Sequence, residues 1–108
     1  MTLIEQLRAV RARIEKGWTQ QWFYKKDGQN LDSSKRHLAD CCCLLGACIM
    51  ESGEIPCKRS QVEEYIHEYI HETYGCNIPT WNDRRERTKQ DVLDLLDLLI
   101  ERVARSMC

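Results

Sequence analysis

The sequence predicts an all-α fold, a compact bundle of about four helices with a short irregular or hairpin segment between the first two. Three observations predict it. Hydroxyl and carboxylate residues spaced as capping boxes precede three segments, apolar residues recur in those segments at helical spacing, and only five glycines and two prolines interrupt 108 residues. A chain of this length forms one core, so we expect a single helical domain over residues 1–108.

The first helix is expected over residues 3–16, where Thr2 and Glu5 form the capping box and Gly17 offers a left-handed stop. Its apolar stripe consists of Leu3, Leu7, Val10 and Ile14. The next segment, residues 18–31, is rich in aromatic residues and contains the turn sequence Lys25-Lys26-Asp27-Gly28. Such a pattern is typical of an extended stretch and a tight turn, which together can make a two-stranded flap.

A second helix is expected over residues 35–52, with N-caps offered by Asp32, Ser33 and Ser34 and a stop at Gly53. Its buried stripe would be Leu38, Cys42, Leu45 and Ile49. Gly46 inside this helix costs about 1 kcal/mol relative to alanine, which indicates that a neighbouring helix packs closely against it.

The last two helices are expected over residues 61–74 and 89–106. Ser60 with Glu63 and Thr88 with Asp91 mark their starts, and Gly75 offers a stop after the first of them. The final helix is apolar around most of its girth, so we expect it at the centre of the bundle. Its only water-facing strip would be Asp94, Asp97, Glu101 and Arg105.

Charge is unevenly distributed although the net charge is only −1. Residues 1–36 hold eight Lys and Arg against four Asp and Glu, whereas residues 37–80 hold two against seven. The fold could therefore present one basic and one acidic patch, but the whole chain is neither a nucleic-acid mimic nor a strongly basic binder. The longest apolar run, residues 41–48, is far shorter than the roughly 20 residues of a membrane span. With no secretory signal pattern after Met1, we expect a cytoplasmic protein without a membrane partner.

Seven cysteines are the first candidates for chemistry, namely Cys41, Cys42, Cys43, Cys48, Cys57, Cys76 and Cys108. Their odd number and the lack of a C-x-x-C pair favour free thiols in a reducing compartment, most of them acting as small core residues. His67 and His71 share one helical face at the spacing of a two-histidine metal site, and Glu64, Glu68, Cys57 or Cys76 could add a ligand. Two histidines on a solvated helix edge are the alternative interpretation, and we expect no metal and no cofactor.

Catalytic constellations are few. Asp94 and Asp97 lie one turn apart among alternating charges, a pattern typical of a solvated helix face. Asn82 and Asp83 are expected to hydrogen-bond the turn that leads into the last helix, while Trp81 pins that turn to the core. Since no nucleophile and base can be paired, we expect a protein that is not an enzyme.

Three stretches together resemble a known family. They are Trp18-Thr19-Gln20, Cys43-Leu44-Leu45-Gly46-Ala47, and Trp81-Asn82-Asp83 followed by Arg87 to Leu93. Their order is similar to that of a small family of unknown function from actinobacteria and bacteriophages. Its motifs read W-x-Q-G, C-A-L-G-A and W-N-D…R-T-x-E-D-V-L. Here Gln21 stands where glycine is usual. The resemblance implies a mostly helical domain, and its presence in phages implies an anti-CRISPR-like inhibitor of a host defence complex.

The function expected from these patterns is that of a small non-enzymatic protein-interaction module. Its contact residues would be Trp22, Phe23, Tyr24, Lys25 and Lys26, which combine aromatic rings with cations on a loop. The partner would be a host protein or ribonucleoprotein complex. Direct binding of nucleic acid is the alternative, through these aromatics and the basic residues Arg8, Arg11, Lys16, Lys25, Lys26, Lys35 and Arg36. The other alternative is a zinc-binding regulatory protein that uses His67 and His71.

Overall fold

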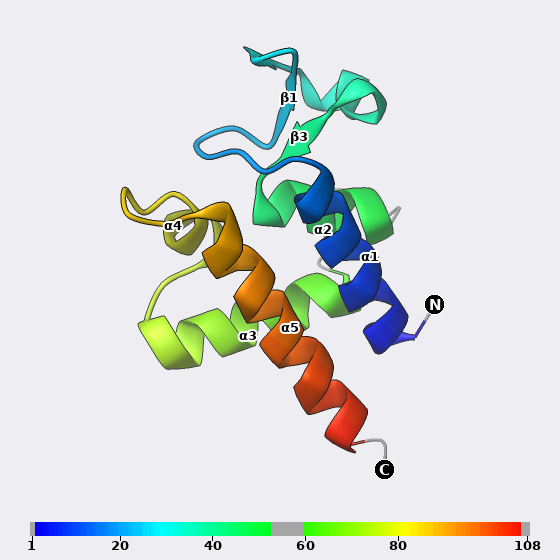
Figure 1. Cartoon of the computed structure of the whole chain (residues 1–108), viewed down its shortest axis with the longest axis vertical. Coiled ribbons are helices and arrows are strands. Elements are labelled where there is room, and N and C mark those ends of the chain that lie inside the picture. Colours follow the sequence, from blue (N-terminus) through cyan, green and yellow to red (C-terminus); the bar gives the residue numbers. More distant parts are fainter. Residues whose placement is uncertain (1, 53–59, 107–108) are drawn as a thin grey trace.

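Most of the chain forms helices around an apolar core, and a small sheet stands at one end of them (Figure 1). The computed structural model describes residues 2–52 and 60–106. Its helices are α1 (Leu3–Lys16), the 3-10 helix η1 (Ser33–Leu38), α2 (Leu44–Ser52), α3 (Gln61–Tyr74), α4 (Ile78–Asn82) and α5 (Lys89–Ser106). Its strands are β1 (Tyr24–Lys26), β2 (Gln29–Asn30) and β3 (Cys41–Cys42).

The prediction of an all-α four-helix bundle is wrong. In the described part of the chain, six helices accompany a three-stranded antiparallel sheet of order β2-β1-β3, so the fold is mixed α/β. The turn between β1 and β2 consists of Asp27 and Gly28, both at positive φ. This backbone geometry matches the right-handed twist of a hairpin. The predicted hairpin between the first two helices is therefore confirmed, and the sheet is completed by a strand that the sequence did not predict.

The first half of the predicted helix over residues 35–52 is wrong. That stretch contains η1 and β3, and regular α-helix begins only with α2. Its backbone groups find partners far away, since Cys42 N–H donates to the carbonyl of Gly17 (3.0 Å) and Cys43 N–H to that of Phe23 (3.1 Å). These distant acceptors satisfy N–H groups that a helix would have paired locally.

Helices α1, α3 and α5 begin and end as predicted. At the start of α1, Thr2 and Glu5 make both hydrogen bonds of the capping box. At the start of α5, the Thr88 hydroxyl accepts from Asp91 N–H (3.2 Å) and the Asp91 carboxylate accepts from Thr88 N–H (3.0 Å). Gly75, at φ 71°, ends α3 in the expected left-handed conformation.

The core lies where α1 packs along α5 and α2 and α3 close the sides. It consists of Leu7, Val10, Ile14, Tyr24, Cys42, Leu44, Ala47, Cys48, Val62, Ile66, Ile70, Ile78, Trp81, Val92, Leu93, Leu95, Leu96 and Leu99. Helix α5 supplies more of these residues than any other element, as expected of a central helix. It is not covered all round, because Leu98 is exposed. Within the described residues, none of the helices has the length and apolar character needed to cross a membrane.

Helix α4 is a short element that the sequence analysis did not predict. Asn77 caps it by accepting from Thr80 N–H (2.9 Å), and Pro79 occupies its first turn, where a missing N–H does no harm. The helix carries Trp81 and Asn82 into the interior, which makes it the link between the core and the sheet.

Residues 18–42, here called the flap, contain the sheet and η1. Two glycines let the flap approach the helices closely: a Cβ on Gly17 would lie 2.1 Å from the Asp40 carbonyl, and one on Gly46 2.6 Å from the Phe23 carbonyl. The close packing predicted at Gly46 is confirmed, but its neighbour is the backbone leading into β1 rather than a helix. Gly17 is extended, not left-handed as expected.

Candidate functional site

Large apolar side chains exposed to solvent are concentrated on the flap. Of the five in the described part of the chain, Trp22 (51% exposed), Phe23 (40%) and Leu38 (50%) belong to it. The other two, Tyr74 and Leu98, lie on α3 and α5. Leu38 was expected on a buried stripe, but η1 turns it outward. Because apolar groups gain free energy on leaving water, such a concentration marks a surface suited to binding.

The five predicted contact residues, 22–26, do not share one face. Trp22, Phe23 and Lys26 are exposed, Lys25 is half-buried, and Tyr24 is buried in the core. Burial raises the pKa of the Tyr24 phenol to about 12. Strand β1 begins at Tyr24, which is buried, and ends at Lys26, which is exposed, while Trp22 and Phe23 precede the strand. Tyr24 is therefore a core residue beneath the surface rather than part of it.

Trp22 and Phe23 border a surface depression of about 260 Å³. Leu31 adds an apolar wall, and Asp32 places a carboxylate at the rim. The ring of Phe23 meets the buried ring of Tyr24 edge to face, with 6.1 Å between centroids. Phe23 is thus supported from below, while Trp22 beside it projects into solvent.

The flap is held in place by one buried side chain, that of Asn82. Its Oδ1 accepts hydrogen bonds from Trp18 Nε1 (2.8 Å) and from Leu44 N–H (3.1 Å). Its Nδ2 donates to the Thr19 carbonyl (3.2 Å) and to Asp83 Oδ1 (2.9 Å). All four hydrogen-bonding positions of the amide are therefore used. They join the start of the flap, the start of α2 and the end of α4.

Two glutamines continue this anchoring up to the exposed aromatics. Gln20 Nε2 donates to the carbonyls of Asn82 (3.0 Å) and Arg84 (2.8 Å). Gln21 N–H donates to Asp83 Oδ1 (2.8 Å), and Gln21 adopts φ 70°, an uncommon conformation for a residue with a side chain. The backbone next to Trp22 is therefore fixed before any partner arrives.

The predicted role of Asn82 and Asp83 requires a correction. They were expected to bind the turn that leads into α5, but they bind the start of the flap instead. Trp81 does pin that turn to the core: its side chain is buried and its carbonyl accepts from Arg87 Nε (3.0 Å). The anchoring by Gln20 was missed, because its partners lie more than 60 positions along the chain. The W-x-Q spacing was the one available signal.

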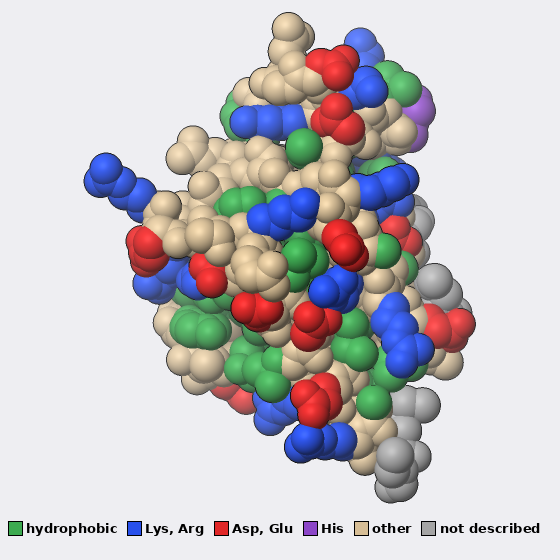
Figure 2. All heavy atoms as spheres, in the orientation of Figure 1, with side chains coloured by type: hydrophobic (Ala, Val, Ile, Leu, Met, Phe, Trp, Pro, Cys, Tyr) green, Lys and Arg blue, Asp and Glu red, His purple; other side chains and the backbone are tan. Residues whose placement is uncertain are grey.

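A continuous basic patch does not form from the cations of the first segment. Arg11 pairs with Glu15 (2.9 Å) and with Asp97, and Arg13 pairs with Glu51 (2.7 Å). Figure 2 shows the result, a face on which Lys and Arg alternate with Asp and Glu. On the flap itself, Lys25, Lys26, Lys35 and Arg36 stand with Asp27, Asp32 and Asp40.

Three of the five described cysteines are buried thiols, whereas Cys41 and Cys76 are half-buried. Cys42, Cys43 and Cys48 have almost no exposed surface, and burial raises the pKa of Cys42 and Cys43 to about 11 and that of Cys48 further still. They are therefore protonated at neutral pH, which makes them poor nucleophiles. Cys43 Sγ also accepts from Gly46 N–H (3.2 Å) at the start of α2. Cys57 and Cys108 lie outside the described residues.

The proposed metal ligands His67 and His71 stack on the surface of α3 with 5.8 Å between ring centroids. Their shared face is as predicted. Among the described residues, no group of three or more His, Cys, Asp or Glu is placed to hold a metal ion. Cys57, one of the residues considered as a further ligand, is not among them.

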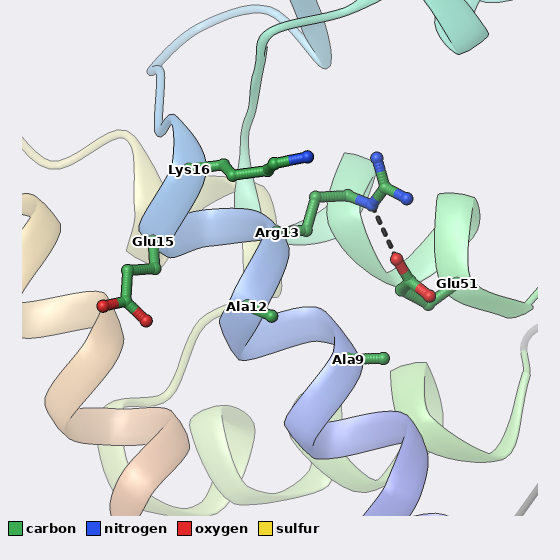
Figure 3. A pocket seen from close by; sticks show the side chains of 6 residues that line it. All are labelled: Ala9, Ala12, Arg13, Glu15, Lys16 and Glu51. Atoms are coloured by element: carbon green, nitrogen blue, oxygen red, sulfur yellow. Dashed lines mark hydrogen bonds and ion pairs between the residues drawn. The ribbon is translucent and has the colours of Figure 1, made fainter.

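Another depression, about 550 Å³, lies along α1 beside α2. Figure 3 shows Ala9 and Ala12 at its floor and the Arg13–Glu51 ion pair at its side. Two cations and two carboxylates line it, so its charges cancel and select no ligand. We therefore place the candidate site on the flap, at Trp22 and Phe23.

The model of DUF6197, a family of unknown function, matches residues 1–102. The chain belongs to this family. No curated protein and no solved structure matches this DUF6197 chain. The matched region covers the flap, the Asn82 anchor and nearly all of α5, so the candidate site lies within the DUF6197 domain.

Proposed function

We propose that this DUF6197 protein is a non-enzymatic protein-interaction module whose contact surface is centred on Trp22 and Phe23. One observation carries the proposal: two large aromatic side chains are held out of the core by a backbone that hydrogen bonds fix on both sides. The burial of Cys42 and Cys43 supports a non-enzymatic role, because their raised pKa values keep these two thiols protonated at neutral pH.

The anchoring is what makes the exposed rings suitable for binding. Gln21 N–H is fixed to Asp83, and the Phe23 carbonyl accepts from Cys43 N–H. Trp22 lies between these two fixed points. A preorganised loop loses less conformational entropy on binding than a mobile one, so more of the contact energy appears as affinity. Lys25 and Lys26 flank the rings and supply positive charge that steers an acidic partner during encounter.

A protein partner fits this surface better than a nucleic acid. Asp32 places a carboxylate in the same depression as the two rings, where it would repel a phosphate. Arg11, one of the residues that the nucleic-acid alternative would use, pairs with Glu15 of the chain itself. Its neighbour Arg13 pairs with Glu51. The affinity of nucleic-acid binders rests on cations that are available to phosphates.

The finer form of the proposal concerns the partner. In this form, the protein is an inhibitor of a host defence complex, anti-CRISPR-like in action. It would cover a surface of a host protein or ribonucleoprotein complex, which is the partner. This form is supported by the resemblance of the Trp18, Cys43 and Trp81 stretches to proteins of bacteriophages.

Site-specific cross-linking tests the proposal. A photo-reactive amino acid at position 22 should cross-link to a partner protein in host lysate, whereas the same group at Glu86, an exposed residue beyond α4, should not. With the partner purified, Trp22→Ala should weaken binding at least tenfold, as for a central aromatic contact. Reversal of Lys25 and Lys26 to Glu should slow association most strongly at low salt.

The matched control for Trp22→Ala is Leu98→Ala, which removes an exposed apolar side chain from α5, away from the flap. Unchanged affinity after both Trp22→Ala and the lysine reversal would place the interface elsewhere. Cross-linking of position 22 to nucleic acid alone would favour the nucleic-acid alternative.

A further inference from the structure

A second surface, remote from the flap in sequence, carries the remaining exposed apolar side chains. Tyr74 (46% exposed) and Leu98 (41%) border a depression of about 260 Å³ between the end of α3, α4 and the start of α5. In Figure 2, green side chains gather between α3 and α5 beside a row of red ones along α5. We call this depression the α3–α5 groove; its lining is completed by Tyr69, Trp81, Arg87, Asp91, Asp94 and Leu95.

The carboxylates of α5 differ according to whether they face the groove. Asp97 and Glu101, beyond it, form ion pairs with Arg11 and Arg105. Asp91 and Asp94, within it, have no ion-pair partner among the described residues. Asp91 accepts from Thr88 N–H and Asp94 from Gln90 Nε2 (2.8 Å), and both of these donors are uncharged. The groove therefore presents two carboxylates without an ion-pair partner, and one guanidinium, that of Arg87, beside apolar rings.

Two aromatic rings that line the groove already contact guanidinium groups of the chain itself. The Arg87 guanidinium lies 3.9 Å from the centroid of the Trp81 ring, and the Arg102 guanidinium lies 5.3 Å from that of Tyr69. Both contacts are cation–π interactions, in which the ring face attracts positive charge. Arg87 is also held by the Trp81 carbonyl. Tyr74, whose ring is 5.9 Å from that of Trp81, has no such cation in the described structure.

We propose that the α3–α5 groove docks a segment of a partner protein in which a lysine or arginine stands next to a large apolar side chain. The cation binds Asp94 and the open face of Tyr74, and the apolar side chain packs on Leu98. This surface goes beyond the interaction proposed for the flap and uses none of its residues.

Three synthetic peptides test the chemistry by fluorescence anisotropy: one of leucine and lysine, one of leucine and glutamate, and one of glycine and lysine. The leucine–lysine peptide should bind most tightly. When it is added to the isotope-labelled protein, the amide chemical-shift changes seen by NMR should lie at Tyr74 and Leu98. The affinity of this peptide should fall as salt rises, because part of it is electrostatic. Equal binding of the leucine–glutamate or of the glycine–lysine peptide would overturn the proposal.

Matched variants locate the binding. Asp94→Asn keeps an oxygen for Gln90 but removes the charge, so it should weaken binding threefold to fivefold, whereas Asp97→Asn, one turn on, should not. Leu98→Ala should weaken binding by at least threefold, and Leu38→Ala should not. Affinity unchanged by both groove variants would overturn the proposal, as would self-association of the chain through Leu98. Trp22→Ala should leave peptide binding intact, so a failure of the flap interaction does not affect this result.

Discussion

Asn82 is the residue on which the position of the flap depends. A buried amide can satisfy two donors and two acceptors at once, and here they come from four different residues. A serine or threonine hydroxyl at this place could not meet the same partners, because it has a single proton to donate. A polar side chain of this kind fixes one geometry, since any shift of the flap would leave buried groups unpaired.

Replacing Asn82 with alanine should lower the free energy of unfolding by about 2–4 kcal/mol, because Trp18 Nε1 and Leu44 N–H lose a buried acceptor. Urea unfolding measures the change. Asn82→Asp should also destabilise, since it keeps the acceptor but sets a second carboxylate beside Asp83. Asn30→Ala, on the exposed strand β2, is the control and should have little effect. A loss at Asn82 no larger than this control would contradict the anchoring role.

Gln21 adopts φ 70°, in the left-handed region, although it carries a side chain. Left-handed backbone costs about 1–2 kcal/mol in a residue with a Cβ and nothing comparable in glycine. Gln21→Gly should therefore raise the free energy of unfolding by up to about 1 kcal/mol. In contrast, Gln29→Gly in strand β2 should lower it. Thermal melting of the two variants provides the comparison. A Gln21→Gly protein that is less stable than wild type would show that the backbone at Gln21 is not strained.

At the scale of elements, sequence was sufficient where the determining interactions are local. The starts of α1, α3 and α5 follow from a hydroxyl and its own helix, and the apolar stripes follow from the helical period. The hairpin follows from Asp27 and Gly28. The stretch before α2 could not be predicted in this way. Its Leu38 and Cys42 fit a helical stripe, but β3 is formed by contacts with Gly17 and Phe23 that no local pattern records.

The candidate site shows the same division. The sequence located the aromatic segment, but the structure buries Tyr24 and exposes Trp22, two residues that strand alternation would place on one face. The position of Tyr24 is fixed by the pairing of β1 with β3, about 17 positions away. The groove on α3 and α5 was outside the reach of sequence reasoning, because it forms from three elements whose packing is tertiary.

Gly46 tests the contact between the flap and α2. Gly46→Ala adds a Cβ 2.6 Å from the Phe23 carbonyl, and such overpacking costs about 1–3 kcal/mol. This should outweigh the gain of about 1 kcal/mol that alanine brings to a helix. The melting temperature should fall, and the fluorescence of Trp22 should shift as the flap is displaced. Gly75→Ala, with open space around it, should leave that fluorescence unchanged. A stabilised Gly46→Ala protein would show that the flap yields easily.

On the scale of the whole molecule, the uneven charge of the sequence cancels in space. A fold that kept the segments apart could have presented one basic and one acidic patch. Instead, α1 lies between α2 and α5, where Arg13 meets Glu51 and Arg11 meets Asp97. The neutral surface that results leaves Asp91 and Asp94 as the exception on α5.

The stability of the whole molecule should fall at alkaline pH. The ordinary thiol pKa is 9.0, and burial raises that of Cys42 to about 11, so above pH 9 the unfolded chain loses a proton that the native protein keeps. The stabilisation is intact below pH 9 and is lost as pH approaches 11, by about 1.4 kcal/mol per unit for each such thiol. Between pH 9 and 11, Cys42→Ala should therefore lose less stability than wild type in urea unfolding. Parallel losses would show that Cys42 does not contribute.

Helix α1 packs against α5, and the contacts between them include Lys89 Nζ to the Glu15 carbonyl (2.6 Å), 74 positions apart. During synthesis, α1 therefore emerges from the ribosome with Leu7, Val10 and Ile14 uncovered. Helices α2 and α3 can cover α1 in part, but its side toward α5 stays uncovered until α5 has been translated. Up to that moment the nascent chain offers a hydrophobic helix to chaperones. Only then can native packing of α1 against α5 begin, so a translation pause shortly before Lys89 would prolong this exposure.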